Sequence, residues 1–262
     1  MRGYASDLND LQWEQIEPFI PDAKRGGRPR TTNAREIVNA ILYQARTGCQ
    51  WRMLPHHFPP WQTVYRYFRD WQKRGVVRRI YRYVYELTRI CWNRDGAPSA
   101  LVIDSQSVKT GKAGGPRGYD GGKKVKGRKR HVITDTLGYM VDIVVTPANV
   151  HDVHGARKVL TKAKRWLKKK PKVIFADKGY QGEPLAKWVK AEIGAEMHTS
   201  ANPAMKTKQF IPVKKRWVVE RQFAWFGDYR RLDKDQERKI AHSTAFLRWS
   251  MISFMLRQIC PD

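Results

Sequence analysis

The stretch L-V-I-D-S-Q-S-V, residues 101–108, decides the fold that we expect for this chain. Three apolar residues lead into one acid, Asp104, and polar residues follow, which is typical of a buried strand that ends in a carboxylate. The same pattern recurs in K-V-I-F-A-D-K-G, residues 172–179, where Asp177 ends the apolar run. Two strands that end in this way predict a site with two carboxylates at one edge of a sheet.

Strand and helix patterns alternate around these two acids. After a Gly/Pro hinge at 93–99 the sequence predicts, in order, a strand at 99–108, a strand pair at 129–134 and 139–146, a helix at 152–166, a strand at 172–176, a helix at 183–193, a strand at 196–199, and helices at 216–228 and 244–259. This order is typical of an α/β domain with a mixed central sheet and helices on its faces. We therefore expect one α/β domain over residues 96–262.

The first 95 residues show only helical spacing. Helices are expected at 7–20, 33–47, 59–74 and 76–92, so we predict an all-α domain over residues 1–95. The second and third helices could form a helix-turn-helix-like pair. The side chains that this pair would present to DNA are Gln62, Tyr65, Arg66 and Arg69. The alternative is that Tyr65 belongs to the core and that the arginines form a solvated face.

The charge balance indicates a polyanionic partner. Lys and Arg number 51 against 24 Asp and Glu, which gives a net charge of +27. Nucleic acid is favoured over an anionic membrane, because aromatic residues are spread along the whole chain and no separate amphipathic arm is present. Basic runs are often solvated faces, but here we expect phosphate contacts from Lys124, Lys126, Arg128, Lys129, Arg130, Arg216, Arg230 and Arg231.

Several other classes of protein are disfavoured. The three cysteines are widely spaced and the histidines form no zinc-binding motif, so neither a disulfide framework nor a zinc site is expected. The sequence shows no signal peptide and no apolar run of about 18 residues. We therefore expect no membrane span and a cytoplasmic, nucleoid-associated protein.

Glu220 is the candidate for a third carboxylate, because it lies on an otherwise apolar helix face in R-W-V-V-E-R-Q-F-A-W-F, residues 216–226. Three carboxylates can hold two Mg²⁺ ions, with Mn²⁺ as an alternative, for attack on a phosphodiester. Each acid also has a structural alternative: Asp104 and Asp177 could cap a turn, and Glu220 could pair with Arg216. The weaker candidates, expected in loops, at caps or facing solvent, are Asp120, Asp135, Asp142, Asp152, Asp233, Asp235 and Glu237.

Six motifs, in order along nearly the whole chain, resemble the bacterial insertion-sequence transposases of the IS5 family. They are G-C-Q-W-R-M-L-P (48–55), P-P-W-Q-T-V-Y-R-Y-F (59–68), I-D-S-Q-S-V-K-T (103–110), G-Y-D-G-G-K-K-V-K-G-R-K-R-H (118–131), A-D-K-G-Y (176–180) and V-V-E-R-Q-F-A-W-F (218–226). The resemblance implies an RNase H-like catalytic core with a DDE triad, carried here by Asp104, Asp177 and Glu220.

The family's signature around the glutamate is kept in part. It reads Tyr, two residues, Arg, three residues, Glu, six residues, Lys. Arg216 stands at the Arg position, whereas Val213 and Gly227 replace the Tyr and the Lys. The resemblance therefore assigns the three catalytic acids, but it does not assign all the residues that contact the DNA strands.

The resemblance also implies a mechanism and partners. Metal-activated water cleaves double-stranded DNA at the terminal inverted repeats of an insertion sequence, and the freed 3′-hydroxyl attacks target DNA without a covalent protein–DNA intermediate. The N-terminal helical domain recognises the repeats, and the pairing of two ends implies a homodimer or larger assembly on DNA. Two alternatives stay open: a repressor or inactive relative that binds ends without cutting, and a nuclease of the same fold that never rejoins DNA.

Overall fold

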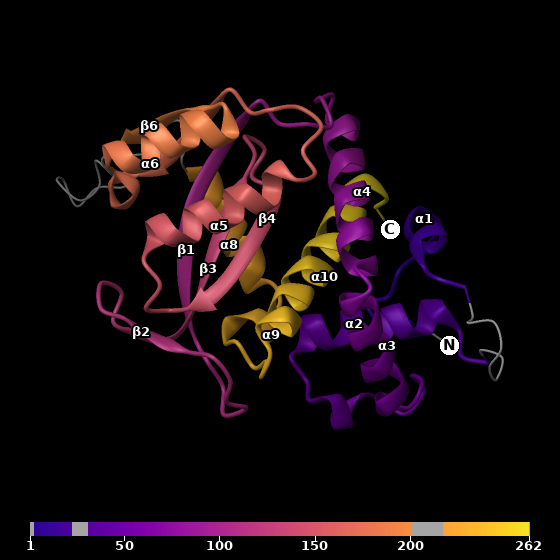
Figure 1. The fold of residues 1–262 in the computed structure, drawn as a ribbon. Helices are drawn as coiled ribbons and strands as arrows, with labels where there is room; N and C mark the ends of the chain where they lie inside the picture. The colour runs from indigo at the N-terminus through magenta and orange to yellow at the C-terminus, as the bar shows by residue number, and fades with distance from the viewer. Residues whose placement is uncertain (1–2, 23–30, 201–216, 262) are drawn as a thin grey trace. The chain divides into compact units, whose positions relative to one another are not determined.

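The computed structural model describes residues 3–22, 31–200 and 217–261 of the chain (Figure 1). Its contacts divide into a helical unit (Met1–Gly96, Phe226–Asp233 and Ala241–Asp262) and a sheet unit (Ala97–Trp225 and Lys234–Ile240). The C-terminal segments thus cluster with the N-terminal helices, whereas sequence order alone placed all residues after 95 in one domain. The assignment of DNA recognition and catalysis to the two expected domains stays a prediction.

The helical unit contains the four expected N-terminal helices together with C-terminal ones. The bounds are α1 (Asp10–Ile16), η1 (Glu17–Phe19), α2 (Ala34–Thr47), η2 (Trp51–Met53), α3 (Trp61–Lys73), α4 (Val76–Cys91), α9 (Arg230–Asp233) and α10 (Ile240–Ile259). The apolar helix α10 packs on α3 through Phe68 and Phe246, with ring centroids 4.7 Å apart, and through Trp71 and Trp249 at 6.3 Å. No helix in the described ranges has the length and hydropathy of a membrane-spanning segment.

Local sequence signals set where the first helices begin and end. Asn9 caps α1 in a capping box with Gln12, and Asn33 caps α2 by accepting the amide hydrogen of Arg35 at 2.8 Å. Gly48 ends α2 with a φ of 72°, a left-handed conformation that glycine adopts without strain. These signals need no distant partner, and α2 lies within one residue of its expected range, 33–47, whereas the first helix, expected at 7–20, begins only at Asp10.

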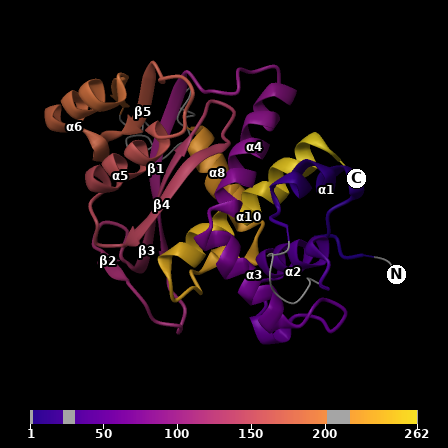
Figure 2. The same ribbon diagram turned by 45° about the vertical axis from the view of Figure 1, so that its right-hand side comes forward.

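The sheet unit confirms the predicted mixed sheet. Its strands are β1 (Ala100–Lys109), β2 (Gly118–Asp120), β3 (Val125–Thr134), β4 (Met140–Pro147), β5 (Val173–Asp177) and β6 (Glu196–Ser200). The strand order is β2-β3-β1-β5-β6, and β4 pairs with β3. β3 is antiparallel to β1 and β4, whereas β5 is parallel to β1, beside which it lies in Figure 2, and to β6.

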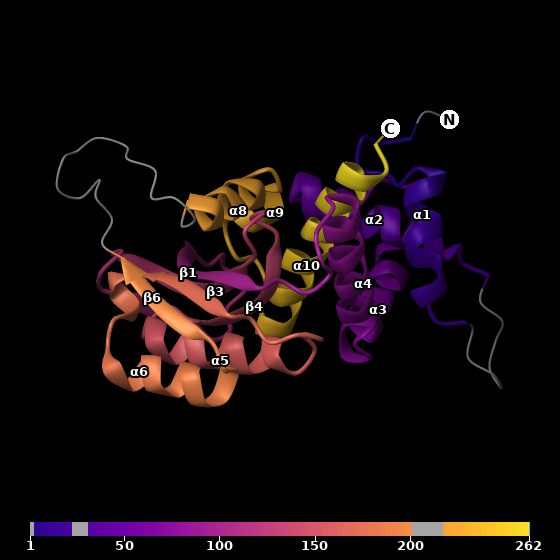
Figure 3. The ribbon, with the colours of Figure 1, turned by 90° about the horizontal axis from the view of Figure 1, so that it is seen from above.

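Helices cover both faces of this sheet (Figure 3). One face carries α5 (Asp152–Lys164) and α6 (Glu183–Trp188), which continues as the π-helical η4 (Val189–Ile193). The other face carries α8 (Trp217–Gly227), the helix that bears Glu220. Side chains alternate along a strand, so neighbouring residues of β1 face different helices.

Three acids that were expected to face solvent are buried. Asp142 on β4 is 4% exposed and lies 3.3 Å from the Nζ of Lys162. Asp235 is also 4% exposed and forms an ion pair of 2.9 Å with Arg128, and Glu237 is 8% exposed. The prediction was wrong for all three, and for Asp142 and Asp235 the reason is that the basic partners that make burial tolerable lie far away in the sequence.

Candidate active site

The strands β1 and β5 set Asp104 and Asp177 opposite one another. The two strands pair in parallel, with Val102 opposite Phe175 as the last pair. Continued by two residues, this register brings Asp104 beside Asp177, and neighbouring strands are about 4.8 Å apart. Beyond the last pair, β1 and β5 no longer pair with each other. β1 remains paired with β3, and β5 remains paired with β6. Asp177 therefore lies at the carboxyl end of β5, and Asp104 lies within β1, just beyond its last pair with β5. Open parallel sheets commonly bind ligands where such strands separate.

The helix α8 packs on the same two strands. Its residues Val218 and Val219 form one core cluster with Val102 of β1, and Phe175 of β5 packs against that cluster. Glu220 follows directly in the helix, and its side chain is exposed. The sheet face on which α8 packs is thus the face that carries Val102 and Phe175.

Strand alternation places both aspartates on that face. Val102 and Asp104 are two residues apart in β1, and Phe175 and Asp177 are two residues apart in β5, so each pair points to the same side of the sheet. Glu220 extends from the helix that covers this side. The three acids predicted from the sequence therefore share one side of the sheet unit.

The three side chains do not form a closed metal site in this conformation. Among the described residues, no three His, Cys, Asp or Glu side chains lie close enough to hold a metal ion together. Asp177 accepts the amide hydrogen of Gly179 at 2.9 Å and caps the 3-10 turn η3 (Lys178–Tyr180). Two neighbouring carboxylates nevertheless fit a hard divalent cation, because Mg²⁺ commonly takes one or two carboxylates with water and phosphate. The joint role of the three acids stays a prediction.

A cluster of charged residues that the sequence did not reveal lies on the other face of β1. Lys129 on β3 is 5% exposed, and its Nζ lies 3.1 Å from Asp120 Oδ2 and 3.2 Å from Asp152 Oδ1. Ser107 donates a hydrogen bond to Asp120 at 2.6 Å. Burial would raise the pKa of Asp120, but hydrogen bonds from Ser107, the Lys123 amide and Lys129 outweigh it and lower the pKa to about 2. We call Ser107, Asp120, Lys129 and Asp152 the Lys129 cluster.

Tyr180 is the last residue of η3, which directly follows the candidate carboxylate Asp177. Its side chain is 1% exposed. Burial raises the pKa of its hydroxyl well above the usual value, and the negative charges of Asp104, Asp152 and Asp177 raise it further. The interaction with Ser105 acts in the opposite direction and lowers this pKa. Such contributions require the three carboxylates to lie near the hydroxyl. The sequence signal for Tyr180 was its place in A-D-K-G-Y, three residues after Asp177.

His131 lies beside the Lys129 cluster and is kept neutral. It is fully buried, its Nε2 lies 3.0 Å from Thr146 Oγ1, and its Nδ1 lies 3.9 Å from Asp152 Oδ1. A Cβ on Gly155 of α5 would come within 2.0 Å of its ring, so α5 can pack here only with glycine at that position. Burial lowers the pKa of His131 to about 4, and the positive charge of Lys129 adds to this effect, whereas Asp152 opposes it.

We expect His131 to make the protein sensitive to acid. Its pKa falls from 6.5 in the unfolded chain to about 4 in the folded one, so the unfolded state binds the proton first. Stability that is fully present above pH 6.5 is therefore lost as the pH falls towards 4, by about 3 kcal/mol. The variant His131→Gln should flatten the curve of unfolding free energy against pH in this range. The exposed His198→Gln is the control, and an unchanged slope in His131→Gln would contradict the assignment.

Three basic residues that were expected to contact phosphate are buried in β3. The exposed fractions of Arg128, Lys129 and Arg130 are 0%, 5% and 2%, and each has a polar partner within the sheet unit. β3 has strands on both edges and helices on both faces, so its side chains point into covered regions. The prediction of DNA contact is corrected for these three residues, whereas Lys124 and Lys126 are exposed.

The candidate DNA-contact residues of α3 divide into two groups. Gln62, Arg66 and Arg69 are exposed. Tyr65 is half-buried, with its ring 5.1 Å from that of Trp51, and the guanidinium of Arg69 lies over the Tyr65 ring at 5.7 Å. Tyr65 therefore contributes to packing, as one alternative expected, while the other three form an accessible polar face.

The remaining basic candidates also differ from one another. Arg216 lies outside the described residues, and Arg230 is exposed. Arg231 is 8% exposed, donates a hydrogen bond to the carbonyl oxygen of Cys49 at 3.1 Å, and lies over the ring of Phe246. Its expected contact with DNA is corrected to a structural role in the helical unit.

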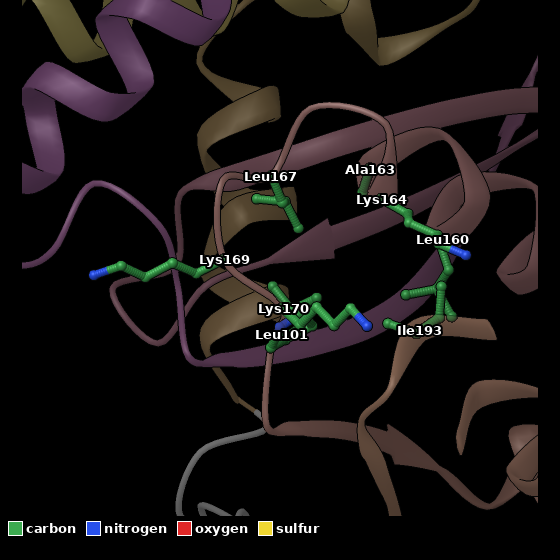
Figure 4. Close-up of a pocket in the computed structure, with 9 residues that line it drawn as sticks. Leu101, Leu160, Ala163, Lys164, Leu167, Lys169, Lys170 and Ile193 are labelled. Atoms are coloured by element: carbon green, nitrogen blue, oxygen red, sulfur yellow. The ribbon is translucent and has the colours of Figure 1, made fainter. Parts of the chain in front are cut away.

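A small recess at the other end of β1 is separate from the candidate site (Figure 4). It is lined by apolar residues that include Leu101, Leu160 and Ile193, with Lys170 at its edge. The space that it encloses, about 20 Å³, holds little more than one water molecule. Because Leu101 precedes Asp104 towards the amino end of the strand, this recess does not contribute to the carboxylate edge.

Two family models match the chain. The model "Transposase DDE domain" matches residues 95–256, more than half of the sequence, and the model "Putative transposase of IS4/5 family" matches residues 8–81. The chain belongs to the DDE transposases of the IS4/5 type. This membership implies an RNase H-like core, in agreement with the mixed sheet and its flanking helices, and it makes DNA the substrate of this transposase.

Individual relatives support the same family. The "Putative transposase for insertion sequence element IS402" of Burkholderia cepacia is 30% identical over 158 residues, which cover 56% of this transposase and 70% of the relative. The "Insertion element IS402 uncharacterized 16.2 kDa protein" of the same species is 32% identical over 114 residues, 41% of this chain and 76% of the relative. The "Uncharacterized protein y4sN" of Sinorhizobium fredii is 32% identical over 117 residues, which cover 44% of this chain and 87% of the relative.

Proposed function

We propose that this transposase binds the terminal inverted repeats of an insertion sequence of the IS5 family, cleaves the DNA at the element ends and joins the freed 3′-hydroxyl to target DNA. The observation that carries the proposal is the parallel register of β1 and β5, which sets Asp104 opposite Asp177 on the side where α8 bears Glu220. DDE transposase domains generally use divalent metal ions, and paired carboxylates suit such ions.

Each acid has a distinct task in this proposal. Asp104 and Asp177 hold the cation from two strand ends whose backbones are fixed by the sheet, and Glu220 supplies the third carboxylate from the exposed side of α8. Bound Mg²⁺ or Mn²⁺ would activate the attacking oxygen and stabilise the leaving oxygen of the phosphodiester. The sheet fixes two of the ligands, and a helix carries the third. The site is therefore complete only when α8 brings Glu220 close to the two aspartates.

The proposed recognition of the repeats uses the accessible face of α3. Gln62, Arg66 and Arg69 lie at positions i, i+4 and i+7, so they share one side of the helix. Glutamine and arginine side chains can read base edges in the major groove, and arginine also binds phosphate. Exposed Arg230 is a further phosphate contact in this proposal. Two element ends must be held together, so two or more copies of the chain act on DNA at the nucleoid.

The proposal is tested by incubating the transposase with DNA that carries the terminal repeats and their flanks, with Mg²⁺ or with EDTA. We expect nicks with 3′-hydroxyl ends at the repeat boundary and, when target DNA is added, joined products, both only with metal. DNA with scrambled repeats is the control. Cleavage without joined products would instead identify a nuclease, and binding without any cleavage would identify a repressor.

A further inference from the structure

The hairpin of β2 and β3 is held in a fixed shape by one carboxylate. Tyr119 pairs with Lys126 across the hairpin, and its turn contains two consecutive glycines at 121–122. Asp120 Oδ1 accepts the amide hydrogens of Gly122 and of Lys123, both at 3.1 Å. An Asp side chain that accepts hydrogen bonds from the backbone of its own turn fixes the conformation of that turn. The turn is therefore rigid although it contains two glycines.

The same carboxylate fastens the hairpin to the rest of the sheet unit. Asp120 Oδ2 accepts the hydrogen bond of Ser107 on β1 and lies 3.1 Å from the Nζ of Lys129 on β3. Lys129 in turn reaches Asp152, the first residue of α5, at 3.2 Å. Removing one member of a buried ion cluster leaves an uncompensated charge, so the cluster strongly favours a single arrangement of these elements.

The turn also bonds to the residue that follows Asp104. Lys123 donates a hydrogen bond from its Nζ to the carbonyl oxygen of Ser105 at 2.6 Å and lies 3.4 Å from the hydroxyl of the same residue. The hairpin turn therefore contacts β1 at Ser105, the residue next to Asp104, from the face opposite the candidate carboxylates.

The outer side of the hairpin presents positive charge. Lys124 and Lys126 are exposed, and Tyr119 is 56% exposed. Lys124 has a φ of 52°, a left-handed conformation that few residues other than glycine adopt, and it lies in the turn that Asp120 anchors. In the part of the chain that the structure describes, no acid pairs with either lysine. In a chain of net charge +27, such side chains suit a polyanion.

We infer that the Lys129 cluster is a positioning device, which holds the hairpin 118–126 against Ser105, the neighbour of Asp104 in β1, so that Lys124 and Lys126 contact the DNA phosphate backbone next to the cleaved bond. The inference rests on the proposed function for the identity of that DNA. The contacts themselves go to phosphate and carry no sequence information. Asp120 and Lys129 act through the hairpin and do not touch DNA.

The first test removes the two exposed charges. Lys124→Gln/Lys126→Gln is expected to weaken binding of terminal-repeat DNA about tenfold near physiological salt, and to reduce the slope of log K against log salt by about 1 to 2. The control Lys170→Gln/Lys172→Gln removes the same charge at the amino end of β5 and should keep the wild-type slope. A wild-type slope in the first double variant would overturn the phosphate contact.

The second test loosens the anchor and keeps both lysines. Asp120→Asn is expected to weaken DNA binding about as much as the lysine double variant, and to accelerate hydrogen exchange at the amides of Gly122 and Lys123. Asp142→Asn is the matched control, because Asp142 is also a buried acid paired with a lysine of α5. Urea unfolding of both variants measures the general loss of stability. If Asp120→Asn binds DNA as tightly as Asp142→Asn, the cluster does not position the hairpin.

Different results would reject the proposed function and the hairpin contact. If the wild type shows neither preference for repeat DNA nor cleavage of it, the proposed function fails. A difference in salt slope between the two lysine double variants on unrelated duplex DNA would then still support the hairpin contact. If the wild type cleaves repeat DNA and the two double variants share one slope, the hairpin inference alone is rejected.

Discussion

Asp104→Ala is expected to abolish the metal-dependent cleavage of terminal-repeat DNA, with a rate loss of at least about a thousandfold, while DNA binding stays within about twofold of the wild type. The register of β1 and β5 sets Asp104 opposite Asp177, so the variant removes one of the two carboxylates that the sheet fixes in place. Asp104 is half-buried, and its truncation leaves no closed cavity in the core. Single-turnover cleavage and filter binding measure the two quantities separately.

Controls separate the loss of a ligand from the loss of any acid. Glu192→Ala removes an exposed acid that pairs with Lys164 in the same unit, and it should cleave at the wild-type rate. Titration calorimetry with Mn²⁺ gives a second readout, in which Asp104→Ala and Asp177→Ala should each weaken binding. Cleavage by Asp104→Ala at the wild-type rate would mean that the active site does not lie at the ends of β1 and β5.

The two strands could be predicted because their signal is local, although β1 continues past Asp104 to Lys109. An apolar run that stops at an acid describes both L-V-I-D at 101–104 and V-I-F-A-D at 173–177, and each is a strand in the structure. The order of elements predicted a mixed sheet with both acids at one edge, whereas the parallel pairing and register of the two strands come from the structure. The side of the sheet on which α8 packs could not be read from the helix alone, because Val218 and Val219 find their partners on β1 and β5.

The basic run K-K-V-K-G-R-K-R at 123–130 shows that charge along the sequence does not reveal burial. It was interpreted as a phosphate-binding surface, but β3 is an inner strand and its residues from 127 to 134 are buried. The acids that neutralise it come from three separate places, Asp120, Asp152 and Asp235. The two most distant partners, Arg128 and Asp235, are 107 residues apart, so only the folded chain brings them together.

The same distant pair leads to the largest expected loss of stability. Asp235→Ala should lower the free energy of unfolding by about 3 to 5 kcal/mol, because it leaves the guanidinium of Arg128 buried without its counter-charge. The two side chains are 1% and 0% exposed, and their atoms lie 2.9 Å apart. Arg128 keeps its hydrogen bonds to the carbonyl oxygens of Pro116 and Arg238, which favours the lower end of this range. Urea unfolding followed by circular dichroism measures the effect.

A double variant shows whether charge is the cause. Arg128→Met/Asp235→Leu replaces both ions by apolar side chains of similar size and should recover most of the loss, since no unpaired charge is left in the core. Lys187→Ala is the surface control: its ion pair with Glu183 is exposed, and its removal should change the unfolding free energy by at most about 0.5 kcal/mol. If Asp235→Ala costs no more than this control, the segment around Asp235 is held by its backbone hydrogen bonds with Lys109 and Gly111, not by the buried ion pair.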